Sequence, residues 1–347
     1  MPDKNGLLRV GVIGLGMGMG HLVSYKDNPK AVVEALSDSD EGWLRYVAKE
    51  YSVNKTYTNY MGLLSDNEID AVSICLPTAL HAEATIAALE SGKHVLCEKP
   101  MATSLKEANA MEETAQKTGK LLMISHQQRF GSDIQLLKRH VDEGTFGDIY
   151  AMRIVWRRPH GMLPTPHTVR LNGGFYSRNW FNEKNNGGGV LRDLGTHMID
   201  LAMYLTGFPT LLSASGSLYR QFYPQGFDRN EYTFDSEDTA IGFVKFKSGL
   251  SVSLEVNFAS YTDKEVIALE IFGSKGGATR INSEVKIYTN VLGADVELCT
   301  IRDDTCVKSS QEHFIDAIIQ GGPVPIPGSE GVEVIRILDE IYRDAKF

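Results

Sequence analysis

Residues 7–21 read Leu-Leu-Arg-Val-Gly-Val-Ile-Gly-Leu-Gly-Met-Gly-Met-Gly-His, an apolar run followed by closely spaced glycines. The apolar run, residues 7–13, is typical of a buried parallel strand. The glycines predict a tight turn into a helix, in which Gly14 permits the turn and Gly16 lets the backbone approach a phosphate. Strand, glycine turn and helix together predict a dinucleotide-binding domain, with a pyrophosphate resting on the helix N-terminus.

The third position of this glycine fingerprint is Met19, where glycine or alanine is usual. Gly18 and Gly20 flank it, so we expect the helix to sit slightly differently against the strand. The alternative interpretation is a flexible turn that binds nothing.

The same pattern then repeats along the chain. Further strands are predicted at residues 32–37, 70–76, 94–97 and 121–124, and helices at 81–91 and 104–119 as well as from residue 40. Strands that alternate with helices indicate a parallel, doubly wound sheet with right-handed crossovers. Such sheets bind ligands at the carboxyl ends of their strands.

The residues expected at this rim form the predicted cofactor site. They are Gly14, Gly16, Met17, Gly18, Met19, Asp38, Ser39, Leu76, Pro77, Thr78, His81, Glu98, Lys99 and Gln127. Asp38 ends the second strand, where a carboxylate accepts from ribose hydroxyls and repels a 2′-phosphate, which favours NAD over NADP. Asp38 could instead cap the next helix, and Arg45 leaves NADP open.

A second distinctive stretch is residues 187–200, Gly-Gly-Gly-Val-Leu-Arg-Asp-Leu-Gly-Thr-His-Met-Ile-Asp. On a helix, Asp193 and His197 share one face, and Asp200 lies near it. A structural pair inside a core is the alternative interpretation. Lys99 directly follows a buried strand and precedes Pro100, which predicts a stiff position on the nucleotide rim.

Downstream of residue 126 the pattern changes to strands with short connections. They are predicted at residues 148–156, 239–246, 250–258, 266–272 and 284–288. Short connections indicate a mainly antiparallel sheet. One face should pack on the helix of residues 187–206, and the other, which carries apolar, Thr and Ser side chains, suggests a homo-oligomer, a dimer or tetramer. We therefore expect two domains, residues 1–126 and 127–347, the second α+β.

Composition narrows the function classes. A formal net charge of −9 over 347 residues argues against nucleic acid or an anionic membrane as partner. The chain has no run of membrane-spanning length and no apolar segment before the first strand, so a cytoplasmic location is the default expectation. The four cysteines form no Cys-x-x-Cys pair, which favours reduced thiols and no structural metal.

Taken together, these motifs resemble the Gfo/Idh/MocA oxidoreductases along essentially the whole chain. The resemblance rests on residues 10–16, Asp38, Glu98-Lys99-Pro100, Arg129-Phe130, residues 188–200 and Phe272-Gly273-Ser274-Lys275-Gly276. It implies nicotinamide-dependent oxidation of a secondary alcohol on a sugar, polyol or similar ring. The family's catalytic lysine, aspartate and histidine map onto Lys99, Asp193 and His197.

Those three residues suit the chemistry. His197 would act as general base, Asp193 would orient it, and Lys99 would stabilise the developing oxyanion. An aromatic loop, residues 157–186, should contribute to substrate selection. The substrate-binding candidates are Lys99, Arg129, His160, Tyr176, Trp180, Asp193 and His197, of which Arg129, His160, Tyr176 and Trp180 could equally be packing residues. Two rival functions remain: a glycosidase that retains NAD, and a non-catalytic dinucleotide sensor that binds a protein partner.

Overall fold

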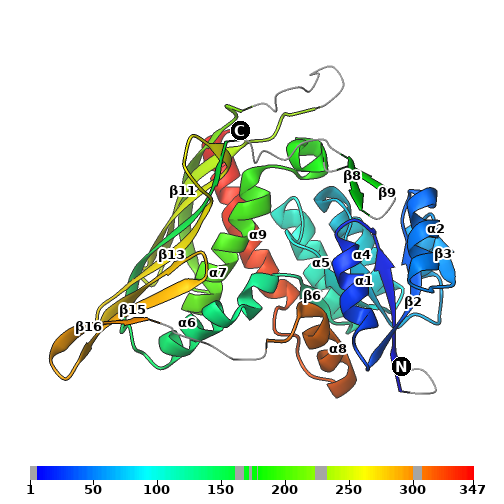
Figure 1. The fold of residues 1–347 in the computed structure, drawn as a ribbon, viewed down its shortest axis with the longest axis horizontal. Coiled ribbons are helices and arrows are strands. Elements are labelled where there is room, and N and C mark those ends of the chain that lie inside the picture. Colours follow the sequence, from blue (N-terminus) through cyan, green and yellow to red (C-terminus); the bar gives the residue numbers. More distant parts are fainter. Residues whose placement is uncertain (1–5, 161–167, 172–173, 178, 223–232, 300–306) are drawn as a thin grey trace.

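The computed structural model describes residues 6–160, 168–171, 174–177, 179–222, 233–299 and 307–347. A parallel sheet with its helices occupies one side of the molecule and a large, tilted sheet the other (Figure 1). Helices from both halves fill the space between them. Within the described residues, no helix is long and apolar enough to cross a membrane.

The N-terminal sheet has six strands in the order β3-β2-β1-β4-β5-β6, all parallel to their neighbours. They are β1 (Leu8–Ile13), β2 (Ala31–Ser37), β3 (Lys55–Tyr57), β4 (Ala71–Ile74), β5 (His94–Cys97) and β6 (Leu122–Ile124). The helices are α1 (Gly18–Lys26), α2 (Glu41–Glu50), α3 (Tyr60–Leu64), α4 (His81–Glu90) and α5 (Leu105–Thr118). This order is that of a dinucleotide-binding sheet, so the predicted doubly wound fold is confirmed.

The C-terminal sheet has eight strands in the order β10-β11-β12-β7-β13-β14-β15-β16. They are β7 (Ile149–Pro159), β10 (Leu211–Tyr219), β11 (Thr239–Phe246), β12 (Ser251–Ser260), β13 (Val266–Gly273), β14 (Gly276–Ile281), β15 (Glu284–Val291) and β16 (Ala294–Cys299). Only β7 and β12 pair in parallel, and the other neighbours are antiparallel. The predicted, mainly antiparallel sheet is therefore confirmed.

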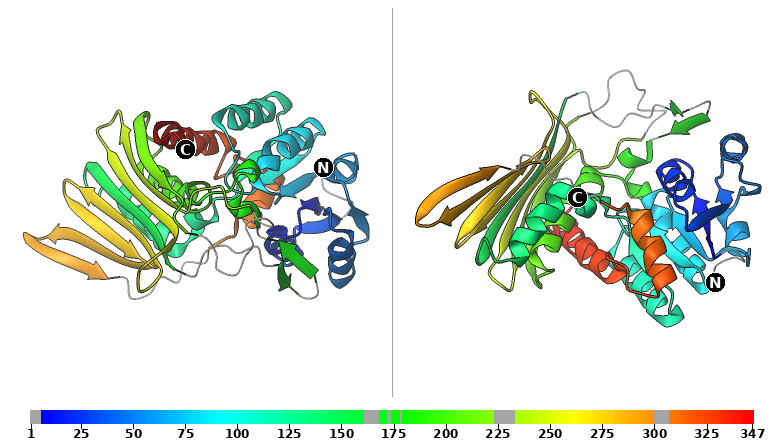
Figure 2. Two further views of the ribbon diagram at one scale, coloured as in Figure 1. Left: turned by 90° about the horizontal axis from the view of Figure 1, so that it is seen from above. Right: turned by 60° about the horizontal axis from the view of Figure 1, so that its bottom comes forward.

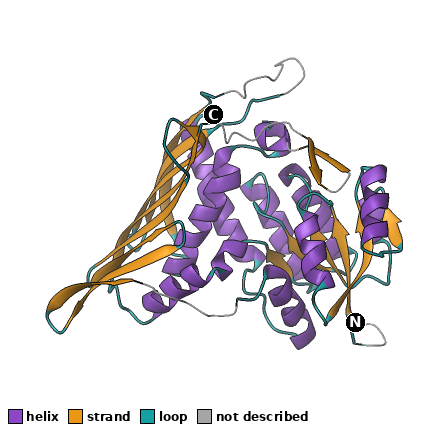
Figure 3. Cartoon of the chain, viewed as in Figure 1, coloured by secondary structure: helices purple, strands orange, loops and turns teal. Residues whose placement is uncertain are grey.

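One face of this sheet forms a core with α6 (Ser132–Asp142), α7 (Thr196–Thr206) and α9 (Gly328–Ala345), as Figure 2 shows. Alternate residues of β12, Val252, Leu254 and Val256, are buried there, as the alternation in the sequence predicts. Helix α7 packs on β7 and β12, and α9 packs on β10. Among the described residues no helix covers the opposite face (Figure 3).

The C-terminal segment joins the two halves of the chain. Helix α8 (Ser310–Gln320) lies against α1, where the hydroxyls of Ser24 and Ser309 are 3.1 Å apart. The backbone N–H of Ile124 at the edge strand β6 donates to the carbonyl of Ile326 over 3.0 Å. Helix α9 then continues to the large sheet. Part of the segment predicted to belong to the second domain therefore rests on the first.

Between β7 and α7 the chain forms short elements. They are the hairpin strands β8 (Thr168–Leu171) and β9 (Gly174–Ser177), the 3-10 turns η3 (Asn179–Asn182) and η4 (Lys184–Asn186), and the π turn η5 (Leu191–Gly195). Strand β9 lies near α2 of the N-terminal half. The stretch expected to be an aromatic loop thus reaches back over the nucleotide-binding half.

Candidate active site

The glycine turn closes tightly on the neighbouring strand. Gly14 has a φ of +86°, and a Cβ there would lie 2.6 Å from the carbonyl oxygen of Cys75. A Cβ on Gly18 would lie 2.9 Å from Val12 on β1. Gly18 therefore provides the close helix–strand packing for which the fingerprint uses its third glycine. The Met19 departure is compensated one residue earlier, without a change of fold.

A cleft of about 450 Å³ opens beside this turn, at the carboxyl ends of the strands. Its lining includes six of the predicted cofactor residues, namely Gly14, Gly16, Asp38, Ser39, Leu76 and Pro77. Helix α1 starts here with no side-chain cap and no acidic residue in its first turn. An uncapped helix N-terminus of this kind is suited to an anion, as a pyrophosphate requires.

Asp38 stands where a ribose-binding carboxylate is expected. Its Oδ2 accepts from the backbone N–H of Leu15 over 2.7 Å, and its Oδ1 accepts from that of Asp40 over 2.9 Å. Asp40, and not Asp38, caps α2 by accepting from Trp43. Arg45 is bound to Glu41 at 3.0 Å on the exposed side of α2. The acidic group is thus free of the capping role, which supports NAD.

Several predicted cofactor residues lie beneath the rim instead of lining the cleft. His81 is buried, with one ring nitrogen 2.8 Å from the carbonyl of Pro100 and the other 2.8 Å from that of Leu76. Glu98 is also buried and bonds to His21 at 2.9 Å. Although burial opposes its ionisation, the bond from His21 and the nearby Lys99 lower the pKa of Glu98 to about 2. Both residues therefore shape the strand ends, and their contact with the cofactor stays a prediction.

Of the others, Met17 is exposed and Gln127 is exposed at the start of η2 (Gln127–Phe130). Thr78 is buried with its hydroxyl lacking a hydrogen-bond partner. Thr78 also meets Gly187, where a Cβ would lie 2.7 Å from the Cβ of Thr78 and 2.8 Å from Thr103. Gly187, at the start of the second motif, thus lets the chain approach the nucleotide-binding half closely.

An ion pair between Lys99 and Asp193 connects the two halves of the molecule. The Lys99 Nζ donates to Oδ1 of Asp193 over 2.7 Å and to its backbone carbonyl over 3.1 Å. Both side chains are largely but not fully buried, at 11% and 15% exposure. A strand end of one domain and a helix start of the other are therefore held together by a partly desolvated ion pair.

Asp193 does not pair with His197 as the helical spacing predicts. Residues 191–195 form a π turn, whose hydrogen bonds span one more residue than those of an α-helix. Within this turn the carboxylate of Asp193 faces Lys99. The expected orientation of His197 by Asp193 is not seen in these contacts, since Lys99 binds the carboxylate and Nδ1 of His197 has no hydrogen-bond partner.

His197 is buried, and its Nδ1 has no hydrogen-bond partner. Its ring lies 5.7 Å from that of Trp156 on β7. Burial lowers the pKa of His197 well below its ordinary value, and the positive charge of Lys99 lowers it further. The imidazole is therefore neutral near pH 7, which is the form that a general base requires.

Arg129, predicted to bind substrate, is buried in the core. Its side chain is buried and donates to Asp200 through Nε over 2.8 Å and through a terminal nitrogen over 2.5 Å. Its other terminal nitrogen bonds Glu330 on α9, and its guanidinium lies over the rings of Tyr204 and Phe208. The guanidinium is thus paired with two carboxylates, and Arg129 and Asp200 form a structural pair in the core.

The remaining substrate candidates are only partly placed. His160 is exposed and stacks on Tyr261 with ring centroids 4.9 Å apart. The side chains of Tyr176 in β9 and Trp180 in η3 lie outside the described part of the chain. Sequence reasoning missed another group near His197, in which Trp156 and Arg158 both donate to Glu265, over 2.8 and 3.0 Å. Only the position of Trp156 and Arg158 at the end of a strand could have indicated it.

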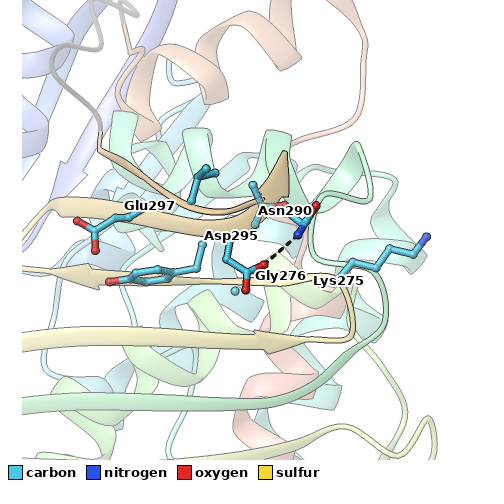
Figure 4. A pocket seen from close by; sticks show the side chains of 9 residues that line it. Lys275, Gly276, Asn290, Asp295 and Glu297 are labelled. Atoms are coloured by element: carbon cyan, nitrogen blue, oxygen red, sulfur yellow. Dashed lines mark hydrogen bonds between the residues drawn. The ribbon is translucent and has the colours of Figure 1, made fainter. Parts of the chain in front are cut away.

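Another hollow, of about 500 Å³, lies among strands β14, β15 and β16 at the far end of the large sheet (Figure 4). Asn290 donates to Asp295 within it over 3.0 Å. None of the residues that line it belongs to the nucleotide rim or to α7. Within the described residues no cluster of three or more His, Cys, Asp or Glu could hold a metal ion.

Buried neutral histidines should make the fold sensitive to acid. Burial lowers the pKa of His126 to about 4. Because the unfolded histidine has a pKa of about 6.5, the unfolded state binds the proton first as pH falls. The free energy of unfolding should therefore decrease between about pH 6.5 and about pH 4, by up to about 3 kcal/mol from this residue. Urea unfolding at about pH 7 and about pH 4.5 measures the difference.

The matched control is H126N, which cannot take up this proton. Its loss of stability on acidification should be smaller than that of the unaltered protein, although H126N starts less stable. An identical pH dependence in both proteins would contradict this prediction. His94, whose pKa burial also lowers to about 4, contributes with the same sign in both proteins.

The chain matches known proteins along both halves. Residues 8–126 match the oxidoreductase family with an NAD-binding Rossmann fold, and residues 134–279 match the GFO/IDH/MocA C-terminal domain. D-glucoside 3-dehydrogenase of Escherichia coli (strain K12) is 31% identical over 350 residues, which cover 98% of this chain and 95% of that protein. The chain belongs to the Gfo/Idh/MocA family of oxidoreductases. Its N-terminal half is accordingly an NAD-binding domain.

Other members of the Gfo/Idh/MocA family show the same likeness. Myo-inositol 2-dehydrogenase of Thermotoga maritima is 32% identical, over 78% of this chain and 74% of that protein. Among solved structures, levoglucosan dehydrogenase in complex with NADH superimposes with a TM-score of 0.84 at 24% identity, covering 98% of this chain and 97% of that one. The structural match shows that the two-domain fold is shared.

Proposed function

We propose that the protein is an NAD-dependent dehydrogenase that oxidises a ring secondary alcohol of a sugar or polyol, with glucosides as the first class to test. The observation that carries this proposal is the convergence of Lys99, Asp193 and His197 from two domains beside the nucleotide cleft. The names of the relatives, a glucoside dehydrogenase and an inositol dehydrogenase, support the substrate class.

The residues present fit NAD. The Gly14 turn leaves no room for a side chain, the N-terminus of α1 is uncapped, and Asp38 borders the cleft. The glycine turn and α1 would hold the pyrophosphate, and Asp38 the ribose hydroxyls. When bound, the nicotinamide supplies the hydride acceptor for oxidation of an alcohol.

The proton of the alcohol must leave as the carbon is oxidised. His197 is neutral and buried, so it can take this proton as general base. The Lys99 ammonium, held by Asp193, can donate a hydrogen bond to the oxygen as negative charge develops on it. Because Asp193 contacts Lys99 and not His197, its role is to place the lysine.

An NAD-reduction screen tests the proposal. Methyl and aryl glucosides, free aldoses, inositols and uronic acids are each added with NAD, and in parallel with NADP. We expect stoichiometric NADH absorbance with at least one glucoside or polyol, and a preference for NAD. Release of an aglycone without net NADH would indicate the NAD-retaining glycosidase instead. Tight NAD binding without any turnover would favour the dinucleotide sensor.

We also propose a homo-oligomer assembled through the uncovered face of the large sheet. Apolar side chains such as Ile241, Phe243 and Ile281 are exposed on this face. Exposed apolar side chains on a sheet face that no described helix covers favour an interface between subunits. Light scattering after size exclusion should give the mass of a dimer or tetramer, and a monomer at micromolar concentration would remove the idea.

A further inference from the structure

A buried glutamate outside both sequence motifs accepts hydrogen bonds from the start of the π turn. Glu237, between β10 and β11, is 2% exposed. Its backbone carbonyl accepts from the N–H of Val190 over 3.1 Å, and its side-chain Oε1 accepts from that of Leu191 over 3.1 Å. These two N–H groups are among those that a helical segment leaves without internal partners. Glu237 thus satisfies the N-terminus of the segment that carries Asp193.

This position of the Glu237 carboxylate requires that residue 189 have no side chain. A Cβ there would lie 2.3 Å from Oε1 and 2.5 Å from Oε2 of Glu237. Gly189 also has a φ of +116°, which other residues rarely adopt. The last glycine of the Gly-Gly-Gly run is therefore where the carboxylate of Glu237 passes close to the backbone.

Helix α9 contacts both Glu237 and Arg192, and the nucleotide-binding half also contacts Arg192. Tyr342 on α9 donates its hydroxyl to Oε1 of Glu237 over 2.6 Å. The guanidinium of Arg192 lies 4.4 Å from the centre of the Tyr342 ring and donates to the carbonyl of Thr103 over 3.1 Å. A continuous set of contacts therefore runs from α9 through Glu237 and the π turn to the residues that follow Lys99.

Asp193 directly follows Arg192 on this turn. Its contact with Lys99 depends on where this turn places its backbone, and Glu237 holds the start of the turn. Without the side chain of Glu237, the N–H of Leu191 loses its partner, and only the bond from Val190 to the backbone carbonyl of residue 237 still holds the start of the turn. The carboxylate would then leave Lys99, whose ammonium would no longer be held at the strand end.

We infer that Glu237, braced by Tyr342, is a positioning residue for the Lys99–Asp193 pair. It acts through the π turn and touches neither the cleft nor the pair itself. This inference rests on the proposed function for its kinetic test, but not for its structural one.

The kinetic test compares E237A, E237Q and Y342F in the full-length protein, with a sugar identified in the NAD-reduction screen. E237A should lower kcat by about 100-fold, the cost of a misplaced catalytic group, and leave the Kd for NAD unchanged. E237Q should recover most of kcat, because its amide oxygen can accept the same bonds from the N–H of Leu191 and the hydroxyl of Tyr342. Y342F, which keeps the ring under Arg192, should lower kcat less than E237A does.

The control variant is D70A. Asp70 is another buried carboxylate and pairs with Arg9 at 2.8 Å, but it precedes β4, at the opposite end of the sheet from the cleft. D70A should lower Tm without changing kcat. A fall in kcat with E237A no larger than with D70A would overturn the inference, as would equal losses with E237A and E237Q. If E237A does not fold, Y342F takes its place in this comparison. A fall in kcat with Y342F no larger than with D70A, or equal losses with Y342F and E237Q, would then overturn the inference.

A crystal structure of E237A, or of Y342F if E237A does not fold, supplies a readout that needs no substrate. The Lys99 Nζ–Asp193 Oδ1 distance of 2.7 Å should lengthen beyond hydrogen-bonding range. An unchanged distance would overturn the inference whatever the activity. If the unaltered protein oxidises no sugar at all, the proposed function fails, and this distance still decides the role of Glu237.

Discussion

Replacement of Lys99 by methionine should lower kcat by two to three orders of magnitude. Lys99 lies beside the proposed hydride-transfer site, and Asp193 holds it over 2.7 Å. Removal of one donor to a developing oxyanion commonly costs about 2.7–4 kcal/mol of barrier, which is roughly 100- to 1,000-fold in rate. The loss should reach the upper end, since K99M also leaves the mostly buried carboxylate of Asp193 unpaired.

Steady-state kinetics with NAD and the best sugar measure this effect, and fluorescence titration measures NAD binding. The Kd for NAD should be unchanged, because Lys99 is absent from the cleft lining. A suitable control is K55M, which removes another lysine held by carboxylates, those of Glu34, Asp66 and Glu68. Near-normal turnover of K99M would sink the assignment of Lys99.

The H197Q variant should lose two to four orders of magnitude in kcat, the usual contribution of a general base. Its residual activity should rise with pH, since hydroxide from solvent would replace the missing base. In the unaltered enzyme, the acidic limb of kcat/KM should lie well below pH 6.5. The pKa of His197 is lowered by burial and by Lys99, so the neutral form persists as the pH falls.

A pH profile of kcat/KM for both proteins carries this test. The matched control is H94Q, because His94 lies at the start of β5, away from the strand ends that form the rim. H94Q should alter stability and leave kcat in place. An acidic limb at about pH 6.5 in the unaltered enzyme, or a flat loss in H197Q at all pH values, would remove His197 as the base.

Much of the fold could be predicted because it depends on local patterns. The buried strands β1, β2, β4 and β5 appear as continuous apolar runs, and the alternation in β12 reveals a sheet with one buried face. Strands β10 and β14 were not predicted. Their sequences are rich in Ser, Ala and Gly, and they are strands because their neighbours pair with them.

The candidate site could be predicted less well. The sequence alone shows three polar residues beside or within apolar stretches, namely Lys99, Asp193 and His197. Asp38 could be placed by its distance from the glycines. Arg129 belongs to a recognisable motif, yet it is buried against Asp200 and Glu330. Whether a charged side chain faces a cleft or a core depends on segments distant in the sequence, as Glu330 shows.

By itself, the sequence determined the architecture of two sheets and the NAD-binding turn, because periodicity and glycine spacing act within a few residues. Only the tertiary structure decided that Asp193 holds Lys99 instead of His197. Lys99 comes from the other domain, and Glu237 and Tyr342 meet the turn that carries Asp193 from elsewhere in the chain. Helical periodicity places residues on one face, but which partner a charged group meets there depends on segments distant in the sequence.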